Sequence, residues 1–279
     1  MQTPSFRLFA RAHAALITGL SVLAMSLAVY LLTVAPAQAA PRSSKPTIVL
    51  VHGAFAESSS WNAVAGQLLA NGYPVIAAAN PLRSVKGDAA YVGKVVESIK
   101  GPVVLVGHSY GGSVISAAAV GKNNVKALVY IAGFAPDAGE TAAALSAKFP
   151  GSTLGAALAP PVTLEDGGED LYIDQGKFRA QFAADVPAAE SKLMAATQRP
   201  ITKAALNEPA GTPAWRTIPS WFVFGSLDNN IPRTAQAFMA KRAGAKKVVE
   251  IDGASHVLMI SRPDAVVRLI EEAATATTS

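Results

Sequence analysis

Short apolar runs alternate with segments of helical spacing along the chain after about residue 46. The apolar runs are continuous and lack the period of two of a half-exposed strand, so they are typical of parallel strands buried on both faces. They are Thr47–Val51, Pro74–Ala78, Val103–Val106, Ala127–Ile131, Trp221–Phe224 and Val248–Ile251. The helical segments run from near Trp61 to Asn71-Gly72 and over Asp88–Ile99, Gly111–Val120, Pro232–Ala243 and Pro263–Ala274. This alternation predicts an α/β fold with a doubly wound, mostly parallel sheet.

One long stretch interrupts the alternation. Between the strand ending near Ile131 and the strand beginning at Trp221, about 90 residues carry no clear strand pattern. A connecting loop of that length is unusual in a compact domain. Helix-like pieces such as KFRAQFAADV and AAESKLMAATQ therefore favour a helical cap, at about residues 135–218, over one edge of the sheet. The alternative is a large surface excursion.

The first 39 residues have the pattern of a secretory signal peptide. Arg7 and Arg11 make the start positive, the run Ala14–Val34 has no charge, and Ala37-Gln38-Ala39 offers small residues at a cleavage site. We therefore expect a cleaved leader, residues 1–39, and a protein that is periplasmic or secreted. The apolar run is close to membrane-spanning length, so an uncleaved membrane anchor is the alternative.

Charge and composition narrow the classes of function. The chain of 279 residues is 51% hydrophobic and 15% charged, which is typical of a folded domain and not of a disordered chain. Without the leader it keeps 22 basic and 19 acidic residues, a net charge of +3 that is scattered along the chain, so nucleic-acid binding has little support. It has no cysteine, which excludes disulfides, thiolate metal sites and a cysteine nucleophile.

Residues 101–112, GPVVLVGHSYGG, carry the clearest chemical motif. In Gly107-His108-Ser109-Tyr110-Gly111 the pattern G-x-S-x-G follows a predicted strand and precedes a predicted helix, the context in which it presents a nucleophilic serine. In so tight a turn, glycines two residues before and after Ser109 leave room where side chains would collide. The turn should place the Ser109 hydroxyl over the carboxyl end of the sheet. The alternative is an incidental glycine-rich helix start.

Serine is a weak nucleophile at neutral pH and needs a base. After the leader the chain has three histidines, His52, His108 and His256. His256 comes just after the last apolar strand, in a loop at the carboxyl edge of the sheet, and we expect it to be the general base for Ser109. We assign His108 to packing and His52 to a turn that it shapes by hydrogen bonding.

A third group must fix the tautomer of the imidazole and stabilise its charged form. Asp228 follows the penultimate strand by a few residues, and we expect it to be the partner of His256. Asp137, after the strand ending near Ile131, is the competitor, because an acid could also reach the histidine from there. Asp252 is too close to His256 in sequence and is interpreted as a turn residue.

An oxyanion formed at the site needs two hydrogen-bond donors. The backbone N–H of Tyr110, directly after the serine, is one. The other should come from the loop after the first strand, where the turn His52-Gly53-Ala54 allows the backbone to approach the substrate closely. The Ala54 N–H is our expected donor, with Phe55 as the next choice.

The segments VLVHGAF, VVLVGHSYGG, FGSLDNNIP and GASHVLMISRP occur in this order along the chain. Together they closely resemble the α/β-hydrolase superfamily, and within it bacterial esterase-like relatives of the plant methylesterase and hydroxynitrile lyase group. The resemblance covers nearly all of the chain after the leader. It implies Ser109 as the nucleophile with Asp228 and His256 as its partners, Ala54 and Tyr110 as oxyanion donors, and a small helical cap over the pocket.

Two departures from the hydroxynitrile lyases favour ester hydrolysis. Those lyases carry a lysine directly after the catalytic histidine, where this chain has Val257, and a threonine where it has Gly53. The hydrolase domain is expected over residues 40–279. The sheet of this superfamily usually has eight strands, and Ala40–Pro46 is too short to form an antiparallel hairpin before the first predicted strand. We therefore expect a reduced sheet of about six strands.

We therefore expect an exported serine hydrolase that cleaves small to medium carboxylic esters through an acyl-enzyme intermediate, with no cofactor and no metal. The cap residues that could line the substrate pocket, each of which could instead only hold the cap to the core, are Phe178, Phe182, Leu193, Met194 and Trp215.

The same three residues support other activities. A cofactor-free perhydrolase of the haloperoxidase type uses such a site with peroxide in place of water. A receptor-like protein of this fold, which binds a ligand with slow turnover, is a different class. An intact triad argues against the receptor, and reaction with a fluorophosphonate probe would discriminate between an enzyme and a receptor.

Overall fold

A parallel sheet of six strands forms the centre of the domain in the computed structural model, which describes residues 45–277. The strand order is β2-β1-β3-β4-β8-β9, and every neighbouring pair is parallel. The strands are β1 (Thr47–Val51), β2 (Val75–Ala78), β3 (Val103–His108), β4 (Val125–Ile131), β8 (Ser220–Gly225) and β9 (Lys247–Ile251). The predicted leader, residues 1–39, lies outside the described residues.

Burial explains why these apolar runs form the sheet. The residues of β1, β3, β4 and β8 are nearly all buried, while the edge strands β2 and β9 are partly exposed. All six predicted strands are present, and their ends differ from the prediction by at most two residues. For example, β3 continues to His108 because that residue still pairs with Ile131 of β4.

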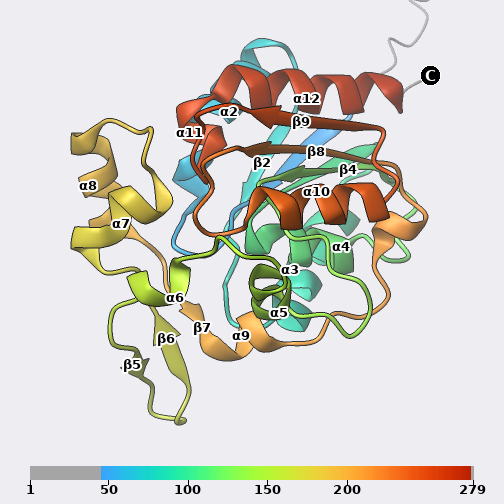
Figure 1. The fold of residues 1–279 in the computed structure, drawn as a ribbon. Helices are drawn as coiled ribbons and strands as arrows, with labels where there is room; N and C mark the ends of the chain where they lie inside the picture. Colours follow the sequence, from blue (N-terminus) through green and yellow to red (C-terminus); the bar gives the residue numbers. More distant parts are fainter. Residues whose placement is uncertain (1–44, 278–279) are drawn as a thin grey trace, which may run out of the picture. The chain divides into compact units, whose positions relative to one another are not determined.

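Helices cover both faces of the sheet (Figure 1). In the view of Figure 1, α2 and α12 lie above the sheet, and α3, α4 and α10 lie below it. Their bounds are α2 (Asn62–Ala70), α3 (Val85–Glu97), α4 (Tyr110–Ala118), α10 (Arg233–Arg242) and α12 (Pro263–Ala276). The predicted start of α3 at Asp88 was three residues late, because the Ser84 side chain accepts a hydrogen bond from Gly87 N and caps the helix earlier. The doubly wound α/β architecture is confirmed.

Residues 132–219, which connect β4 to β8 and which we call the cap, differ in part from the helical prediction. The helices and short 3-10 turn of the cap are α5 (Ala142–Ala147), α6 (Leu154–Ala157), α7 (Gln175–Phe182), α8 (Ala188–Thr197), α9 (Lys203–Asn207) and η2 (Ala214–Arg216). They are joined by an antiparallel sheet of β5 (Val162–Thr163), β6 (Glu169–Leu171) and β7 (Ile201–Thr202). The prediction missed these strands because two or three residues are too few to show a period.

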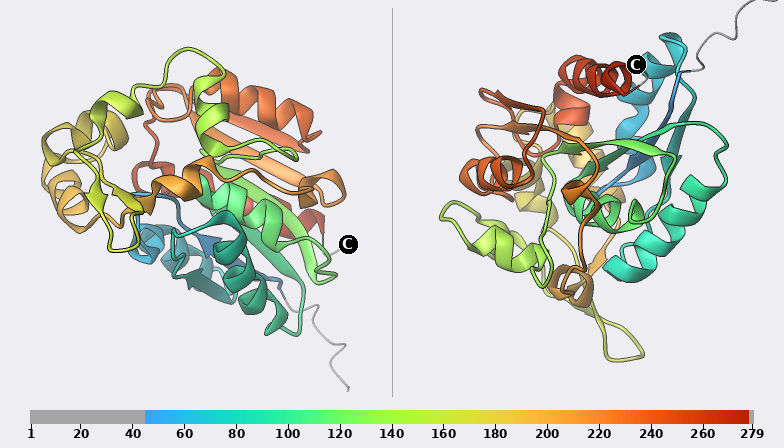
Figure 2. Two further views of the ribbon diagram at one scale, coloured as in Figure 1. Left: turned by 90° about the horizontal axis from the view of Figure 1, so that it is seen from below. Right: turned by 90° about the vertical axis from the view of Figure 1, so that its right-hand side faces the viewer.

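The helices α6, α7 and α8 lie beyond one end of the sheet strands, and the β5–β6 hairpin extends away from the domain (Figures 1 and 2). None of the helices within residues 45–277 is both long enough and apolar enough to cross a membrane.

Candidate active site

Ser109 occupies a strained turn between β3 and α4. Its φ of 52° and ψ of −124° lie outside the regions that L-residues normally adopt. The Ser109 carbonyl accepts hydrogen bonds from Gly112 N at 2.9 Å and from Phe134 N at 3.0 Å. These bonds tie the turn to the first turn of α4 and to the chain after β4, so the surrounding structure holds the strained conformation in place.

The glycines of the motif are required by close contact between backbones. A Cβ atom on Gly107 would lie 2.6 Å from Gly111 O, and a Cβ on Gly111 would lie 2.5 Å from Val51 O. Both contacts are shorter than any real Cβ makes, and backbone atoms cannot rotate aside as a side chain can. The predicted reason for the two glycines is therefore confirmed.

His256 and Asp228 form a buried hydrogen-bonded pair. His256 follows β9, Asp228 follows β8, and Nδ1 of the histidine lies 2.7 Å from Oδ2 of the aspartate. Oδ1 of Asp228 accepts hydrogen bonds from Asn230 N at 2.8 Å and Ile231 N at 3.0 Å, and Oδ2 accepts another from Gln236 Nε2 at 2.9 Å. The carboxylate is thus fully hydrogen-bonded although Asp228 is only 6% exposed.

The two competing aspartates do not bond to His256. Asp137 lies near the surface in an ion pair with Arg216, whose hydrogen bonds hold the pKa of the Asp137 carboxyl below its usual value. Asp252 accepts a hydrogen bond from Ser226 Oγ at 2.9 Å, as expected for a turn residue. Of the three candidates, the structure therefore brings Asp228 to the histidine.

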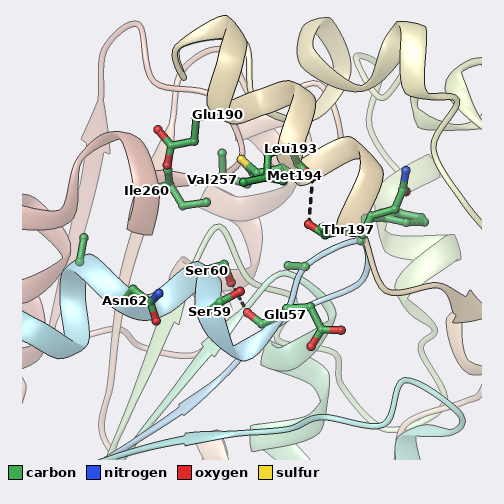
Figure 3. Close-up of a pocket in the computed structure, with 14 residues that line it drawn as sticks. Glu57, Ser59, Ser60, Asn62, Glu190, Leu193, Met194, Thr197, Val257 and Ile260 are labelled. Carbon is green, nitrogen blue, oxygen red and sulfur yellow. Dashed lines mark hydrogen bonds between the residues drawn. The ribbon is translucent and has the colours of Figure 1, made fainter.

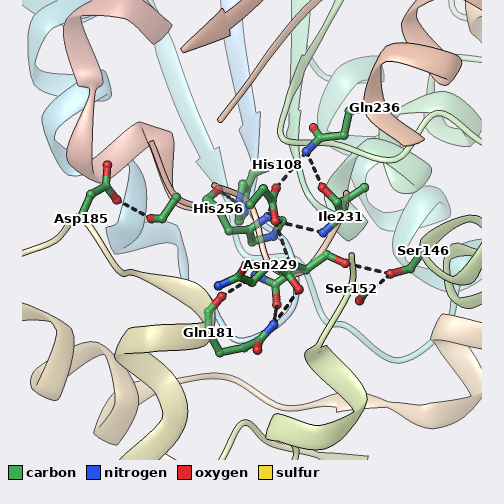
Figure 4. Close-up of polar contacts among 12 residues, drawn as sticks. His108, Ser146, Ser152, Gln181, Asp185, Asn229, Ile231, Gln236 and His256 are labelled. Carbon is green, nitrogen blue, oxygen red and sulfur yellow. Dashed lines mark hydrogen bonds and ion pairs between the residues drawn. The ribbon is translucent and has the colours of Figure 1, made fainter. Parts of the chain in front are cut away.

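The second ring nitrogen of His256 is buried and has no hydrogen-bond partner among the described residues. Ser109 and His256 line the same cavity, but no hydrogen bond joins Ser109 Oγ to His256 Nε2. A buried nitrogen without a partner is costly, and in a native protein it is often explained by a catalytic role. Figure 4 shows His256 at the centre of the surrounding polar contacts.

The other two histidines within residues 45–277 are structural. Nε2 of His52 accepts a hydrogen bond from Asn80 N at 3.1 Å, and Asn80 Nδ2 donates to His52 O at 2.9 Å, so these bonds join the turn after β1 to the chain after β2. His108 is completely buried and packs against His256 with the ring centroids 4.8 Å apart. Its Nε2 lies 3.2 Å from His256 O, and burial holds the pKa of His108 well below its usual value. His108 is therefore a packing residue, as predicted.

The three backbone amides expected near an oxyanion all lie at the cavity, but they differ in their hydrogen bonds. Ala54, Phe55 and Tyr110 all line it. Phe55 N donates to Arg199 O at 3.0 Å, so this amide already has a partner, and Phe55 is a poorer choice of donor than the prediction allowed. Within residues 45–277, no backbone acceptor bonds the amides of Ala54 or Tyr110. These two amides are free to donate into the cavity.

The cavity beside Ser109 has a volume of about 360 Å³ and a mostly apolar lining. Ser109, His256 and the oxyanion loop form one side. The apolar side chains opposite come mainly from the cap and are Phe134, Ala142, Ala143, Ala147, Leu154, Leu158, Phe182, Leu206 and Ile231. Three polar residues, Ser146, Ser152 and Asn230, also reach it. Such a cavity fits a small apolar group.

A model of the Alpha/beta hydrolase family matches residues 48–269. The chain belongs to the α/β hydrolase family. The resemblance of the four sequence motifs to this family is thereby confirmed, as is the fold that it implied.

Individual relatives are distant in sequence. The α/β hydrolase nvfD of Aspergillus novofumigatus (strain IBT 16806) is 28% identical over 255 residues, covering 82% of this chain and 97% of that protein. The α-hydroxynitrile lyase of Arabidopsis thaliana is 26% identical over 241 residues, covering 78% of this chain and 93% of that protein. Among solved structures, polyneuridine aldehyde esterase has a TM-score of 0.70 at 18% identity, over 82% of this chain and 98% of that one, which shows a shared fold.

Of the five predicted pocket walls, one lines the cavity beside Ser109 in this α/β hydrolase. Phe182 is that residue, and Phe178 packs behind it with the ring centroids 5.1 Å apart. Trp215 is buried and does not line this cavity, and its Nε1 donates to Pro136 O at 3.0 Å. The prediction placed these side chains by residue type alone, and their positions depend on how the cap folds.

Leu193 and Met194 line a different cavity, also of about 360 Å³ (Figure 3). This second cavity lies between α8 of the cap and the residues around Ser59 and Asn62 of the hydrolase core. Leu193 is 64% exposed there, and neither residue lines the cavity beside Ser109. The predicted role of both residues as walls of the catalytic pocket is corrected.

Most of the residues that line the cavity beside Ser109 have no signal in the sequence. The alanines of α5 and the leucines of α6 and α9 come from short helices without a marked periodicity. Phe134 had a usable signal, because it follows β4 at the carboxyl edge of the sheet, where ligands of such sheets bind. Within residues 45–277, no group of three or more histidine or acidic side chains lies in position to hold a metal ion.

Proposed function

We propose that this α/β hydrolase cleaves carboxylic esters with Ser109 as the nucleophile, His256 as the general base and Asp228 as its partner. One observation carries the proposal: His256 is bonded through Nδ1 to a buried aspartate, while its other nitrogen has no partner among residues 45–277 and the ring lines the cavity that contains Ser109. A neutral imidazole with Nδ1 bonded to a carboxylate has its lone pair on Nε2, which is the atom that must accept the serine proton.

The proposed reaction has two halves. Ser109 Oγ attacks the ester carbonyl carbon and transfers its proton to Nε2 of His256, while the amides of Ala54 and Tyr110 donate hydrogen bonds to the oxyanion. The imidazolium then protonates the leaving alcohol, and an acyl group remains on Ser109. In the second half, water is deprotonated by His256 and attacks the acyl carbon, which releases the acid and restores the serine.

The cavity supports esters with a small to medium apolar acyl or alkyl group. Its volume of about 360 Å³ and its alanine, leucine and phenylalanine side chains suit a compact apolar group and offer no charged partner. The name of the esterase that shares the fold also supports an ester substrate. Val257, in place of the lysine that the lyases carry after the histidine, favours hydrolysis over cyanide release.

We further propose that the protein is exported, because residues 1–39 have the composition of a secretory signal peptide. The mature protein would act in the periplasm or outside the cell. The N-terminal sequence and intact mass of the protein recovered from its producing cells test this directly. A chain that retains Met1 would support a membrane anchor in place of a cleaved signal.

Reaction with a fluorophosphonate probe tests the proposed nucleophile. A single adduct by intact mass on the wild-type protein, absent from Ser109→Ala, is the expected result. Ester turnover should disappear in the same variant, and an unchanged melting temperature would show that the variant is folded. A well-folded wild type without an adduct would overturn the esterase and favour a receptor. Turnover with peroxide at a rate far above ester hydrolysis would favour a perhydrolase.

A further inference from the structure

A glutamine of the cap is bonded to the loop that carries Asp228. Gln181, near the end of α7, donates from Nε2 to Asn229 O at 2.8 Å and to Asn230 Oδ1 at 3.2 Å. Its backbone carbonyl accepts a hydrogen bond from Asn230 Nδ2 at 3.2 Å, and its Oε1 accepts one from Thr153 Oγ1 at 2.8 Å. The Gln181 side chain thus bonds both residues directly after Asp228 (Figure 4), beside backbone contacts from Thr153, Ala180 and Gln181 itself.

A second cap residue is bonded to the loop that carries His256. Asp185, between α7 and α8, accepts a hydrogen bond from the hydroxyl of Ser255, the residue directly before His256. The other carboxylate oxygen of Asp185 lies 3.4 Å from Arg262 Nη1 at the start of α12. The Asp185 side chain is 13% exposed and Ser255 is 2% exposed, so the hydrogen bond is largely shielded from water.

On the core side, other residues hold Asp228 and His256. Gln236 of α10 donates to Asp228 Oδ2 and to Ile231 O, both at 2.9 Å. The ring of His108 packs against His256 and contacts its carbonyl. The Asp228 and His256 loops are therefore held between the core on one side and the end of α7 with its following loop on the other.

We propose that Gln181 and Asp185 are positioning residues, through which the cap keeps Asp228 and His256 in their hydrogen-bonded arrangement. The proposal rests on the proposed hydrolase function. Neither side chain lines the catalytic cavity, so neither touches the substrate there. Their loss should therefore lower kcat and leave KM nearly unchanged, which differs from the usual role of a cap in substrate binding.

The chain offers a matched control for Gln181. Gln198 is another buried glutamine of the cap, with exposure of 9% against 7% for Gln181. Its Oε1 accepts from Ile173 N at 2.9 Å, and its Nε2 donates to Ile173 O and Ala195 O, both at 2.9 Å. These bonds remain within the cap and do not reach the Asp228 or His256 loops. Gln181→Met and Gln198→Met thus remove similar hydrogen bonds at similar burial.

The first experiment compares ester turnover by these two variants. We expect kcat of Gln181→Met to fall about 10- to 100-fold, because small misplacements of catalytic groups have effects of that size. KM should stay within about twofold, and Gln198→Met should keep a kcat near that of the wild type despite a similar loss of melting temperature. Equal kcat values for the two variants would overturn the positioning role.

The second experiment addresses Asp185. Asp185→Ala should lower kcat, whereas Asp185→Asn keeps an oxygen that can accept the Ser255 hydroxyl and should restore most of the rate. Ser255→Ala removes the same hydrogen bond from the other side, so Asp185→Ala and Ser255→Ala should not be additive in kcat. Additive effects, or an Asp185→Asn variant as slow as Asp185→Ala, would contradict the proposal.

A spectroscopic measurement separates this proposal from the esterase itself. The proton on Nδ1 of His256 gives a downfield proton NMR signal while it is bonded to Asp228. That signal should weaken or shift in Gln181→Met and remain in Gln198→Met, whether or not the protein hydrolyses esters. An unchanged signal in both variants would overturn the positioning role of Gln181. A wild-type protein that does not hydrolyse esters would overturn only the proposed esterase function.

Discussion

His256 Nδ1 lies 2.7 Å from Asp228 Oδ2, and the two side chains are only 1% and 0% exposed although they come from loops after different strands. A hydrogen bond to a carboxylate is stronger where water does not compete for it. A buried carboxylate is costly unless it is paired or hydrogen-bonded. Asp228 has no permanently charged partner, but it also accepts hydrogen bonds from Gln236 and from two backbone amides, which offset this cost. Because the carboxylate holds Nδ1, Nε2 is the ring nitrogen that is left for the proposed proton transfer from Ser109.

Asp228→Asn tests the aspartate in this pair. An amide can donate to Nδ1 and so favours the wrong tautomer of His256, and we expect kcat to fall about 10⁴-fold. Steady-state kinetics with one ester would measure the effect, with Asp137→Asn as the control, since Asp137 is paired with Arg216 near the surface. A rate close to that of the wild type in Asp228→Asn would show that Asp228 is not the partner that the reaction needs.

Gly53→Ala should disrupt the turn that faces the serine. A Cβ atom at residue 53 would lie 2.6 Å from Ser109 Cβ and 2.7 Å from His108 O. We expect a loss of about 1–3 kcal/mol in the free energy of unfolding from this overpacking. Displacement of Ser109 should lower kcat by about 10²-fold.

Gly66→Ala is the matched control for that variant. A Cβ atom on Gly66, within α2, would meet nothing within 4 Å, so the same substitution should raise the free energy of unfolding by about 0.5–1 kcal/mol. Urea unfolding and ester kinetics on both variants make the comparison. Similar free energies of unfolding and similar kcat values for Gly53→Ala and Gly66→Ala would contradict the close contact at Gly53.

Stability should fall as the pH falls from about 7 to 5. Burial is the main cause that lowers the pKa of His108 and of His52 from the usual 6.5, so both histidines bind a proton less readily in the folded protein than in the unfolded chain. Below pH 6.5 the unfolded chain binds protons that the folded protein does not, which favours unfolding by up to about 1.4 kcal/mol per pH unit for each histidine.

Urea unfolding at pH 7 and pH 5 measures this dependence. His108→Gln keeps a hydrogen-bond donor but removes the titrating group, so its stability should change less between the two pH values than that of the wild type. The same change in both proteins would show that His108 is protonated in the folded state.

Ala143→Phe should narrow the substrate range. Ala143 lines the catalytic cavity, so a phenyl ring there would fill space that a longer acyl group needs. Because each buried CH₂ contributes about 0.8 kcal/mol, we expect kcat/KM for hexanoate esters to fall on the order of 10-fold or more relative to acetate esters. Ala144→Phe on the same helix, at an exposed position outside the cavity, should leave that ratio unchanged.

The sequence alone predicted the sheet and the relation of Ser109 to it. Continuous apolar runs identified the six parallel strands, and the elbow motif explained why Gly107 and Gly111 approach other backbones closely. It also placed Asp228 and His256 after the last two strands. Because parallel strands bring their carboxyl ends to one edge of a sheet, residues far apart in sequence could be expected to meet there.

Only the tertiary structure decided which residues line the cavity beside Ser109. It also decided the partner of the Phe55 amide and the contacts of Gln181 and Asp185. Leu193 and Phe182 are both apolar residues of cap helices, yet one lines a second cavity and the other lies beside His256. The short elements of the cap show no periodicity that fixes which face turns inward. Their positions follow from long-range contacts with the core, and residue type alone does not specify those contacts.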